Sequence, residues 1–204
     1  MTLFPIFLNV EGRPCLVVGA GPIGESKIAS LLSAGAAVRV IAPQATATIA
    51  EWAAQGRVVW EARGFAPADL DGVLLLVAVV PSADLAGEIF REARRRGVLC
   101  NSVDDPSHCD FYYPAVVTRG DLQVAISTAG HRPALAQRLR QELEVQFGPE
   151  YEAWVADLGA RRRELLEAEM DPDERRQRLH DLASPRAFKE FVARRSTSSA
   201  RRAS

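Results

Sequence analysis

Apolar residues in the first half of this chain come in short runs separated by polar, glycine-rich segments. The run at 73–80 is apolar throughout, which is typical of a central parallel strand covered on both faces. Shorter runs predict further strands, at 16–18, 37–42, 57–60 and 98–103. Segments with helical spacing follow them, at 25–34, 46–55 and 82–96. This strand–helix alternation predicts an α/β fold with a doubly wound parallel sheet.

The pattern changes after residue 110. Two apolar runs, 111–118 and 122–127, flank Arg119-Gly120-Asp121, so we expect an antiparallel hairpin here rather than another crossover. A helix is expected at 134–147, with Pro133 in its first turn. Short helices of low hydrophobicity, expected to pack on a partner subunit, follow at 151–163, 163–170, 171–182 and 184–194.

Three glycines, Gly19, Gly21 and Gly24, have G-x-G-x-x-G spacing between a strand and a helix. In such turns the first glycine allows a tight turn, the second lets the backbone approach a pyrophosphate, and the third lets the helix pack closely. Pro22 suits the helix's first turn, where its missing N–H is not needed. We therefore predict a dinucleotide site at Gly19, Gly21, Pro22, Ile23 and Gly24; the alternative is a glycine-rich turn without a ligand.

The second strand ends differently from the simplest dinucleotide site. An Asp or Glu about 20 residues after the glycines usually holds the ribose hydroxyls of NAD. Here the strand ends in Ala42, Pro43 and Gln44, with neither an acid nor a basic residue for a 2′-phosphate. We expect these three residues to contact the cofactor. Gln44 can hydrogen-bond a ribose, which mildly favours NAD, but these residues leave NAD against NADP undecided.

Polar residues follow the fifth predicted strand, at 101–106. Ligands of open α/β sheets bind beyond the carboxyl ends of the strands, so the side chains of this segment are expected to face the crevice. A carboxylate there can act as a general base. On spacing alone, a solvated Asp-Asp-Pro turn is an equally good interpretation.

The chain's 25 basic and 26 acidic side chains leave a net charge of −1, which gives no global field for nucleic acid or a membrane. Segment 118–140 is a local exception, with four arginines against the single Asp121. An anionic ligand near a helix N-terminus is one explanation. A solvated helix face is the other, and it is favoured for Arg138 and Arg140.

Cysteine usage indicates the compartment. Cys15, Cys100 and Cys109 are an odd set without C-x-x-C spacing, so we expect reduced thiols in a cytoplasmic protein, with no disulfide framework and no zinc site. The three histidines are too scattered to predict a metal site. The sequence contains no apolar run of about 18 residues, and we expect no secretory signal.

Three stretches together resemble the precorrin-2 dehydrogenase and sirohydrochlorin ferrochelatase family of sirohaem synthesis. They are 3–27, 101–106 and 111–140, and the match covers roughly 3–145. Gly19-Ala20-Gly21 and Gly24 depart slightly from the family's glycines without changing the turn's chemistry, and Gln44 stands where many members carry an acid.

The resemblance implies NAD-dependent oxidation of precorrin-2 to sirohydrochlorin, with Fe²⁺ insertion as a further activity of some members. It also implies a homodimer held by the region after the dinucleotide domain, and it places the catalytic aspartate on Asp104. Together with the local positive charge, it puts the expected contacts to the tetrapyrrole at Asn101, Arg119, Ser127, Thr128, His131 and Arg132.

These observations divide the chain into four expected regions. They are an NAD-binding Rossmann domain at 1–113, a dimerisation hairpin and helix at 114–148, a helical C-terminal region at 149–195, and a disordered tail at 196–204. A rival function is an NAD-sensing regulatory domain, which needs the glycine turn but neither Asp104 nor the arginines. A dehydrogenase of another carboxylated metabolite is a second rival.

Overall fold

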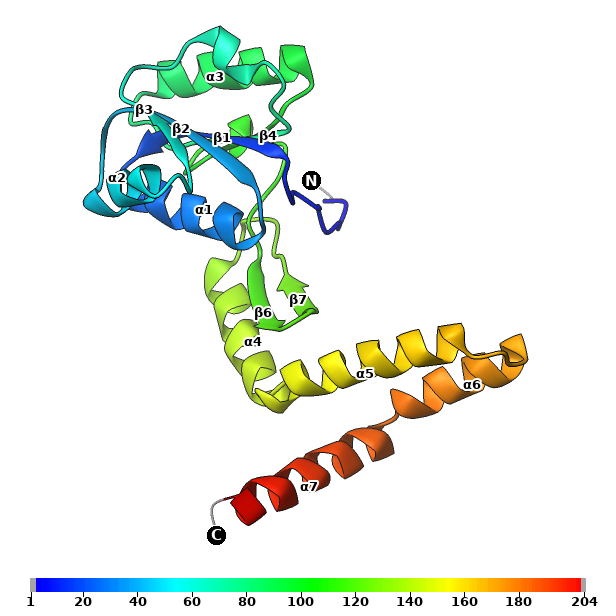
Figure 1. Cartoon of the computed structure of the whole chain (residues 1–204). Helices are drawn as coiled ribbons and strands as arrows, with labels where there is room; N and C mark the ends of the chain where they lie inside the picture. Colours follow the sequence, from blue (N-terminus) through cyan, green and yellow to red (C-terminus); the bar gives the residue numbers. More distant parts are fainter. Residues whose placement is uncertain (1–2, 203–204) are drawn as a thin grey trace. The chain divides into compact units, whose positions relative to one another are not determined.

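The computed structural model describes residues 3–202 and divides the chain into two compact units, one ending at Tyr113 and one beginning at Pro114. The first unit is built on a five-stranded parallel sheet with the order β3-β2-β1-β4-β5 (Figure 1). Its strands are β1 (Pro14–Ala20), β2 (Ala37–Ala45), β3 (Val59–Glu61), β4 (Leu75–Ala78) and β5 (Leu99–Ser102). This order confirms the predicted doubly wound sheet, because after β3 the chain crosses back to the other side of β1, where β4 and β5 lie.

Helices cover both faces of this sheet. They are α1 (Pro22–Ser33), α2 (Ala47–Ala54) and α3 (Ala83–Arg96), with 3-10 turns η1 (Pro67–Leu70) and η2 (Pro106–His108). Figure 1 shows α1 and α2 on one face and α3 on the other. Successive residues of β1 alternate between two cores, since Val17 packs in the cluster that holds Ile28 of α1, and Leu16 in the cluster that holds Ile89 of α3. Double coverage explains why the central strands are apolar without alternation.

The second unit begins with the predicted antiparallel hairpin, β6 (Ala115–Arg119) and β7 (Leu122–Ile126). Its remaining elements are the helices α4 (Pro133–Gln146), α5 (Glu150–Glu167), α6 (Pro172–Leu182) and α7 (Pro185–Arg202). The sequence predicted two helices where α5 runs unbroken. The helix continues through this point because residues 161–164 are Arg-Arg-Arg-Glu, all good helix formers.

The C-terminal helices of this unit pack against one another through aromatic side chains. The ring centroid of Phe188 on α7 lies 4.4 Å from that of Tyr151 and 4.8 Å from that of Trp154, both on α5. Aromatic pairs at these separations stabilise a contact beyond the area they bury. Packing of these helices on a partner subunit, which the sequence predicted, stays a prediction.

The structure corrects the disordered tail expected at 196–204. Residues 196–202 continue α7, and residues 203–204 lie outside the described part of the chain. Adding residues to an established helix costs little compared with nucleating one, and α7 is held near its start by Phe188.

Cys15, Cys100 and Cys109 are all free thiols, as the sequence predicted. Within the described residues, no group of three or more His, Cys, Asp and Glu side chains is arranged to hold a metal ion. The described helices also include none whose length and apolar character would let it cross a membrane.

Candidate dinucleotide and substrate site

The glycine turn joins β1 to α1 and has two glycines that packing requires. Gly19 has a φ of 104°, and a Cβ there would collide with the carbonyl oxygen of Val79. A Cβ at Gly24 would collide with the carbonyl oxygen of Gly19. These two positions hold the helix against the strand, as the motif predicts.

Gly21 is different, because the space beside it is open. It is the N-cap of α1 in an extended conformation, and a Cβ there would meet nothing within 4 Å. The first N–H groups of a helix lack intrahelical partners and attract anions. The turn therefore fits a dinucleotide pyrophosphate, which the backbone from Gly21 to Gly24 would hold.

The end of β2 contains an irregularity that the sequence did not reveal. Val18 pairs with Ile41, but Ala20 pairs with Ala45, so the intervening residues of β2 bulge out opposite Gly19. Ala42 is buried, and its carbonyl oxygen accepts a hydrogen bond from Trp60 Nε1 at 3.0 Å. Pro43 and Gln44 are exposed. Of the three cofactor contacts expected here, Ala42 belongs to the core.

A carboxylate that sequence reasoning did not assign stands at this strand end. The Thr46 hydroxyl donates a hydrogen bond to Glu25 Oε2 at 2.5 Å, and Thr46 also caps α2 by accepting from the Ile49 N–H at 3.3 Å. Glu25 lies in the first turn of α1. The sequence shows an acid directly after the glycine motif, but the spacing of residues does not predict its contact with Thr46.

Asp104 follows β5 in a left-handed conformation, with a φ of 63°. Few residues other than glycine adopt this conformation, and where they do, they gather at functional sites. The side chain is exposed and accepts no hydrogen bond from the residues that the structure describes. Its carboxylate is thus available to a ligand.

Asp105 has quite different surroundings. Its carboxylate accepts a hydrogen bond from Ser107 Oγ at 2.6 Å and pairs with His108 Nδ1 at 2.6 Å. The Ser107 hydroxyl, followed by His108, holds the pKa of Asp105 below its usual value. Asp105 therefore braces the loop, whereas its neighbour is left open.

Lys27 adds a positive charge near Asp104. Its Nζ lies 3.8 Å from the ring centroid of Tyr113. Partial burial lowers the pKa of Lys27, and the negative charge of Asp104 opposes that shift. Burial also raises the pKa of Tyr113 to about 12, so its hydroxyl stays protonated at neutral pH. Lys27 stands one helical turn beyond Gly24, and no role was predicted for it or for Tyr113.

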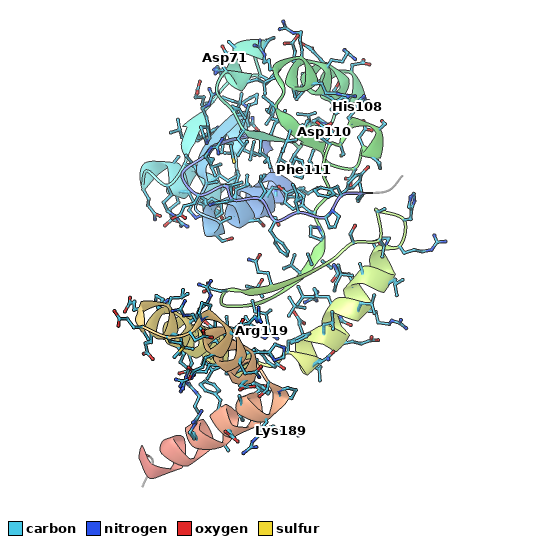
Figure 2. All side chains as sticks on the ribbon, turned by 90° about the vertical axis from the view of Figure 1, so that its right-hand side faces the viewer. Asp71, His108, Asp110, Phe111, Arg119 and Lys189 are labelled. Atoms are coloured by element: carbon cyan, nitrogen blue, oxygen red, sulfur yellow. The ribbon has the colours of Figure 1, made fainter. Side chains whose placement is uncertain are left out.

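Asn101 is occupied by the protein itself. It is 7% exposed, and its Nδ2 donates to the carbonyl oxygen of Phe111 at 2.8 Å. The segment after β5 turns back along the strand, and Figure 2 labels His108, Asp110 and Phe111 on it. Asp110 completes the turn by accepting from the Cys100 N–H at 3.1 Å. The substrate contact expected of Asn101 therefore rests on the resemblance alone.

The residues expected to bind substrate in the second unit do not form one cluster. Arg119 (Figure 2) donates from Nε to the Phe147 carbonyl oxygen at 2.8 Å and from Nη2 to that of Glu144 at 3.1 Å, which caps the C-terminal end of α4. Arg132 is the N-cap residue at the other end of this 14-residue helix, about 21 Å away. The structure thus separates Arg119 from the remaining four.

Those four lie on the segment that leads into α4: Ser127, Thr128, His131 and Arg132. His131 and Arg132 are exposed. Arg138 is 3.4 Å from Glu142 with its side chain 66% exposed, and Arg140 pairs with Glu144. Arg138 therefore lies on a solvated helix face, as the sequence favoured, whereas the Arg140 side chain is partly buried, with 28% of it exposed.

Two family models match the chain in succession. Residues 6–115 match a family described as putative NAD(P)-binding, and residues 119–146 match the central region of the sirohaem biosynthesis protein. The boundary between the two matches lies close to that between the two compact units.

Curated relatives match over almost the whole chain. Siroheme synthase 1 of Serratia proteamaculans is 34% identical over 202 residues, which are 99% of this chain and 42% of the relative. The siroheme synthase of Methylobacillus flagellatus is 40% identical over 151 residues, which are 74% of this chain and 32% of the relative. The chain thus spans less than half the length of these relatives.

The solved structure of SirC, a precorrin-2 dehydrogenase, matches both units at 26% identity and a TM-score of 0.78, covering 94% of this chain and 98% of that one.

Proposed function

Because this chain belongs to the family of sirohaem-synthesis proteins that includes the siroheme synthases and SirC, we propose that it oxidises precorrin-2 to sirohydrochlorin with NAD⁺. The observation that carries the proposal is the match to SirC, which extends through the dinucleotide unit and the hairpin–helix unit alike. A sensor that only bound NAD would need the first unit alone.

The reaction removes a hydride and a proton from the tetrapyrrole. When bound, NAD⁺ supplies the hydride acceptor. Asp104 takes the proton from the substrate carbon, since its carboxylate is exposed at the carboxyl edge of the sheet. Precorrin-2 and NAD⁺ thus give sirohydrochlorin, NADH and a proton.

The start of α4 binds the substrate's carboxylates. Ser127, His131 and Arg132 lie at or just before a helix N-terminus, where free N–H groups and the helix dipole favour anions. Arg119 contributes indirectly by fixing the other end of this helix.

The working form is a homodimer in the cytoplasm. Apolar side chains are exposed on the hairpin and α4, namely Val116 at 38%, Leu135 at 40% and Val145 at 85%. A second copy would cover them, so we assign dimerisation to 114–148. Three free thiols suit the reducing cytoplasm.

An anaerobic assay with precorrin-2 and NAD⁺ tests the reaction. The tetrapyrrole product should have the absorption spectrum of sirohydrochlorin, and its formation should require NAD⁺. Adding Fe²⁺ or Co²⁺ afterwards tests the chelatase activity that the resemblance implies, with metallated product formed faster than in a control without protein. Binding of NAD⁺ without turnover of precorrin-2 would instead favour the sensor or another dehydrogenase.

A further inference from the structure

We propose that Glu25 replaces the acid missing from the end of β2: its carboxylate accepts hydrogen bonds from the adenosine ribose of the dinucleotide and selects NAD over NADP. The inference rests on the proposed function, because it requires a nicotinamide dinucleotide at the glycine turn. It also resolves a choice that Ala42, Pro43 and Gln44 leave open.

The register shift in β2 affects the position where a simple dinucleotide site has its ribose-binding acid. The acid of a simple site would stand in the stretch that bulges out opposite Gly19, between the Ile41 and Ala45 pairings. The strand rejoins β1 beyond the bulge, where the Thr46 N–H donates to the Ala20 carbonyl oxygen at 3.1 Å. Thr46, the residue that follows β2, therefore lies beside the glycine turn.

Glu25 reaches this strand end from α1. Its N–H donates to the Gly21 carbonyl oxygen at 2.9 Å, so its backbone is fixed to the residue that the pyrophosphate must approach. Its Oε2 accepts from Thr46 Oγ1 at 2.5 Å. Thr46 engages one carboxylate oxygen, and Oε1 remains available to a ribose hydroxyl.

The charge on Glu25 discriminates between the two dinucleotides. No Lys or Arg forms an ion pair with it among residues 3–202, so its negative charge is not neutralised by a partner. Lys27 is two residues away on the same helix, a spacing at which side chains do not face each other. A free hydroxyl can donate to this carboxylate, whereas a 2′-phosphate would be repelled by it.

Calorimetric titration of the full-length chain with NAD⁺ and with NADP⁺ tests the proposal without any turnover. Glu25→Gln keeps an oxygen for Thr46 but removes the charge. We expect it to weaken NAD⁺ binding by about tenfold and to bring the two dissociation constants together by more than tenfold. Thr46→Val should shift the ratio in the same direction, because it frees the carboxylate from its support.

Two controls isolate the site. Glu51→Gln neutralises an exposed acid on the neighbouring helix α2 and should leave the ratio unchanged. Thr46→Ser keeps the hydroxyl and should behave as wild type, which separates loss of the contact from loss of the fold. Thermal melting of each variant reports folding independently.

The outcomes are distinct. If wild type binds NAD⁺ and Glu25→Gln leaves the NAD⁺ to NADP⁺ ratio unchanged, Glu25 only supports α2 and the inference is wrong. If the folded wild type binds neither dinucleotide, the proposed function itself fails.

Discussion

Asp104 and Asp105 are adjacent residues with opposite environments. Asp104 has a positive φ and an open carboxylate, while Asp105 is held by Ser107 and His108. Asparagine tolerates the left-handed conformation better than alanine, so Asp104→Asn tests the chemistry without straining the backbone.

We expect Asp104→Asn to lower turnover of precorrin-2 by about 10²–10⁴-fold, the usual effect of losing a positioned base. NAD⁺ affinity and melting temperature should stay near wild type. Asp105→Asn is the matched control, with nearly full turnover and a lower melting temperature. If Asp105→Asn were inactive and Asp104→Asn active, the assignment would be off by one residue, and if both kept full activity, neither carboxylate would be the base.

Asp69 is a structural acid in the same unit. It is 4% exposed and pairs with Arg39 at 3.2 Å and Arg63 at 2.6 Å, which ties η1 to β2 and to the segment after β3. The Arg63 guanidinium, through its hydrogen bond, holds the pKa of Asp69 below its usual value.

Because the pKa of Asp69 is lowered in the folded state, its ionised carboxylate stabilises the fold at pH values above its pKa in the unfolded chain. This stabilisation is lost as the pH falls. The free energy of unfolding should therefore decrease below about pH 4, as Asp69 takes up a proton. Asp69→Asn should lose about 1–3 kcal/mol at pH 7, a modest cost because water still reaches both arginines, and should flatten this acid dependence. Asp71→Asn, which breaks an exposed pair with Arg96, should change stability by less than about 1 kcal/mol. Equal urea midpoints for the two variants at pH 7 would contradict this account.

At the scale of residues, the sequence identified the groups whose role depends on local pattern. The roles of Gly19 and Gly24 follow from spacing along one strand–turn–helix segment, whereas the role of Asp104 came from the resemblance, because spacing alone left a solvated turn equally good. Glu25 and Lys27 could not be assigned, because their partners, Thr46 and Tyr113, come from other elements. The hydrogen bonds that Arg119 donates to the carbonyl groups of Glu144 and Phe147 could not be predicted for the same reason, since these residues lie 25 and 28 residues further on.

The turn between β1 and α1 is the element expected to hold the cofactor, and its glycines are expected to have separable roles. Gly21→Asp places a side chain and a negative charge in open space that the pyrophosphate would fill. We expect calorimetry to show NAD⁺ affinity reduced more than tenfold, with the melting temperature nearly unchanged.

Gly24→Ala supplies the contrast, because its Cβ would collide with the Gly19 carbonyl oxygen. This variant should lower the melting temperature, as overpacking typically costs about 1–3 kcal/mol. Unchanged NAD⁺ binding by Gly21→Asp would show that the dinucleotide does not bind at this turn.

At the scale of elements, periodicity predicted the sheet, its helices and the hairpin. Each of these elements has either a doubly covered apolar run or a clear turn residue, such as Gly97, which ends α3 with a φ of 71°. The bulge in β2 escaped prediction, because it depends on pairing with β1 rather than on the residues of β2 alone. The C-terminal helices were predicted, but the aromatic contacts between α5 and α7 were not, because they join residues far apart in the sequence.

The whole molecule is expected to be a dimer held by the second unit. Sedimentation velocity at micromolar concentration should show a dimer for the full chain, and truncation after Glu150 should weaken it. Val145→Ser should also weaken it without lowering the melting temperature, because that side chain is 85% exposed. Arg138→Ser on the same helix is the control. A monomeric full-length chain would contradict the proposal.

For the substrate, the family resemblance was more informative than composition, charge or periodicity. Composition and charge argued against nucleic acid or a membrane as a partner, but they could not identify a tetrapyrrole as the substrate. Segment 111–140 supplied that information, and its match to the sirohaem central region agrees with it.

The proposed reaction is tested by the stoichiometry of NADH formation when limiting precorrin-2 is titrated anaerobically into the protein with excess NAD⁺. We expect one NADH for each precorrin-2 consumed, with sirohydrochlorin as the tetrapyrrole product and little NADH from Asp104→Asn over the same time. Full binding of NAD⁺ with no NADH formed on adding precorrin-2 would contradict it.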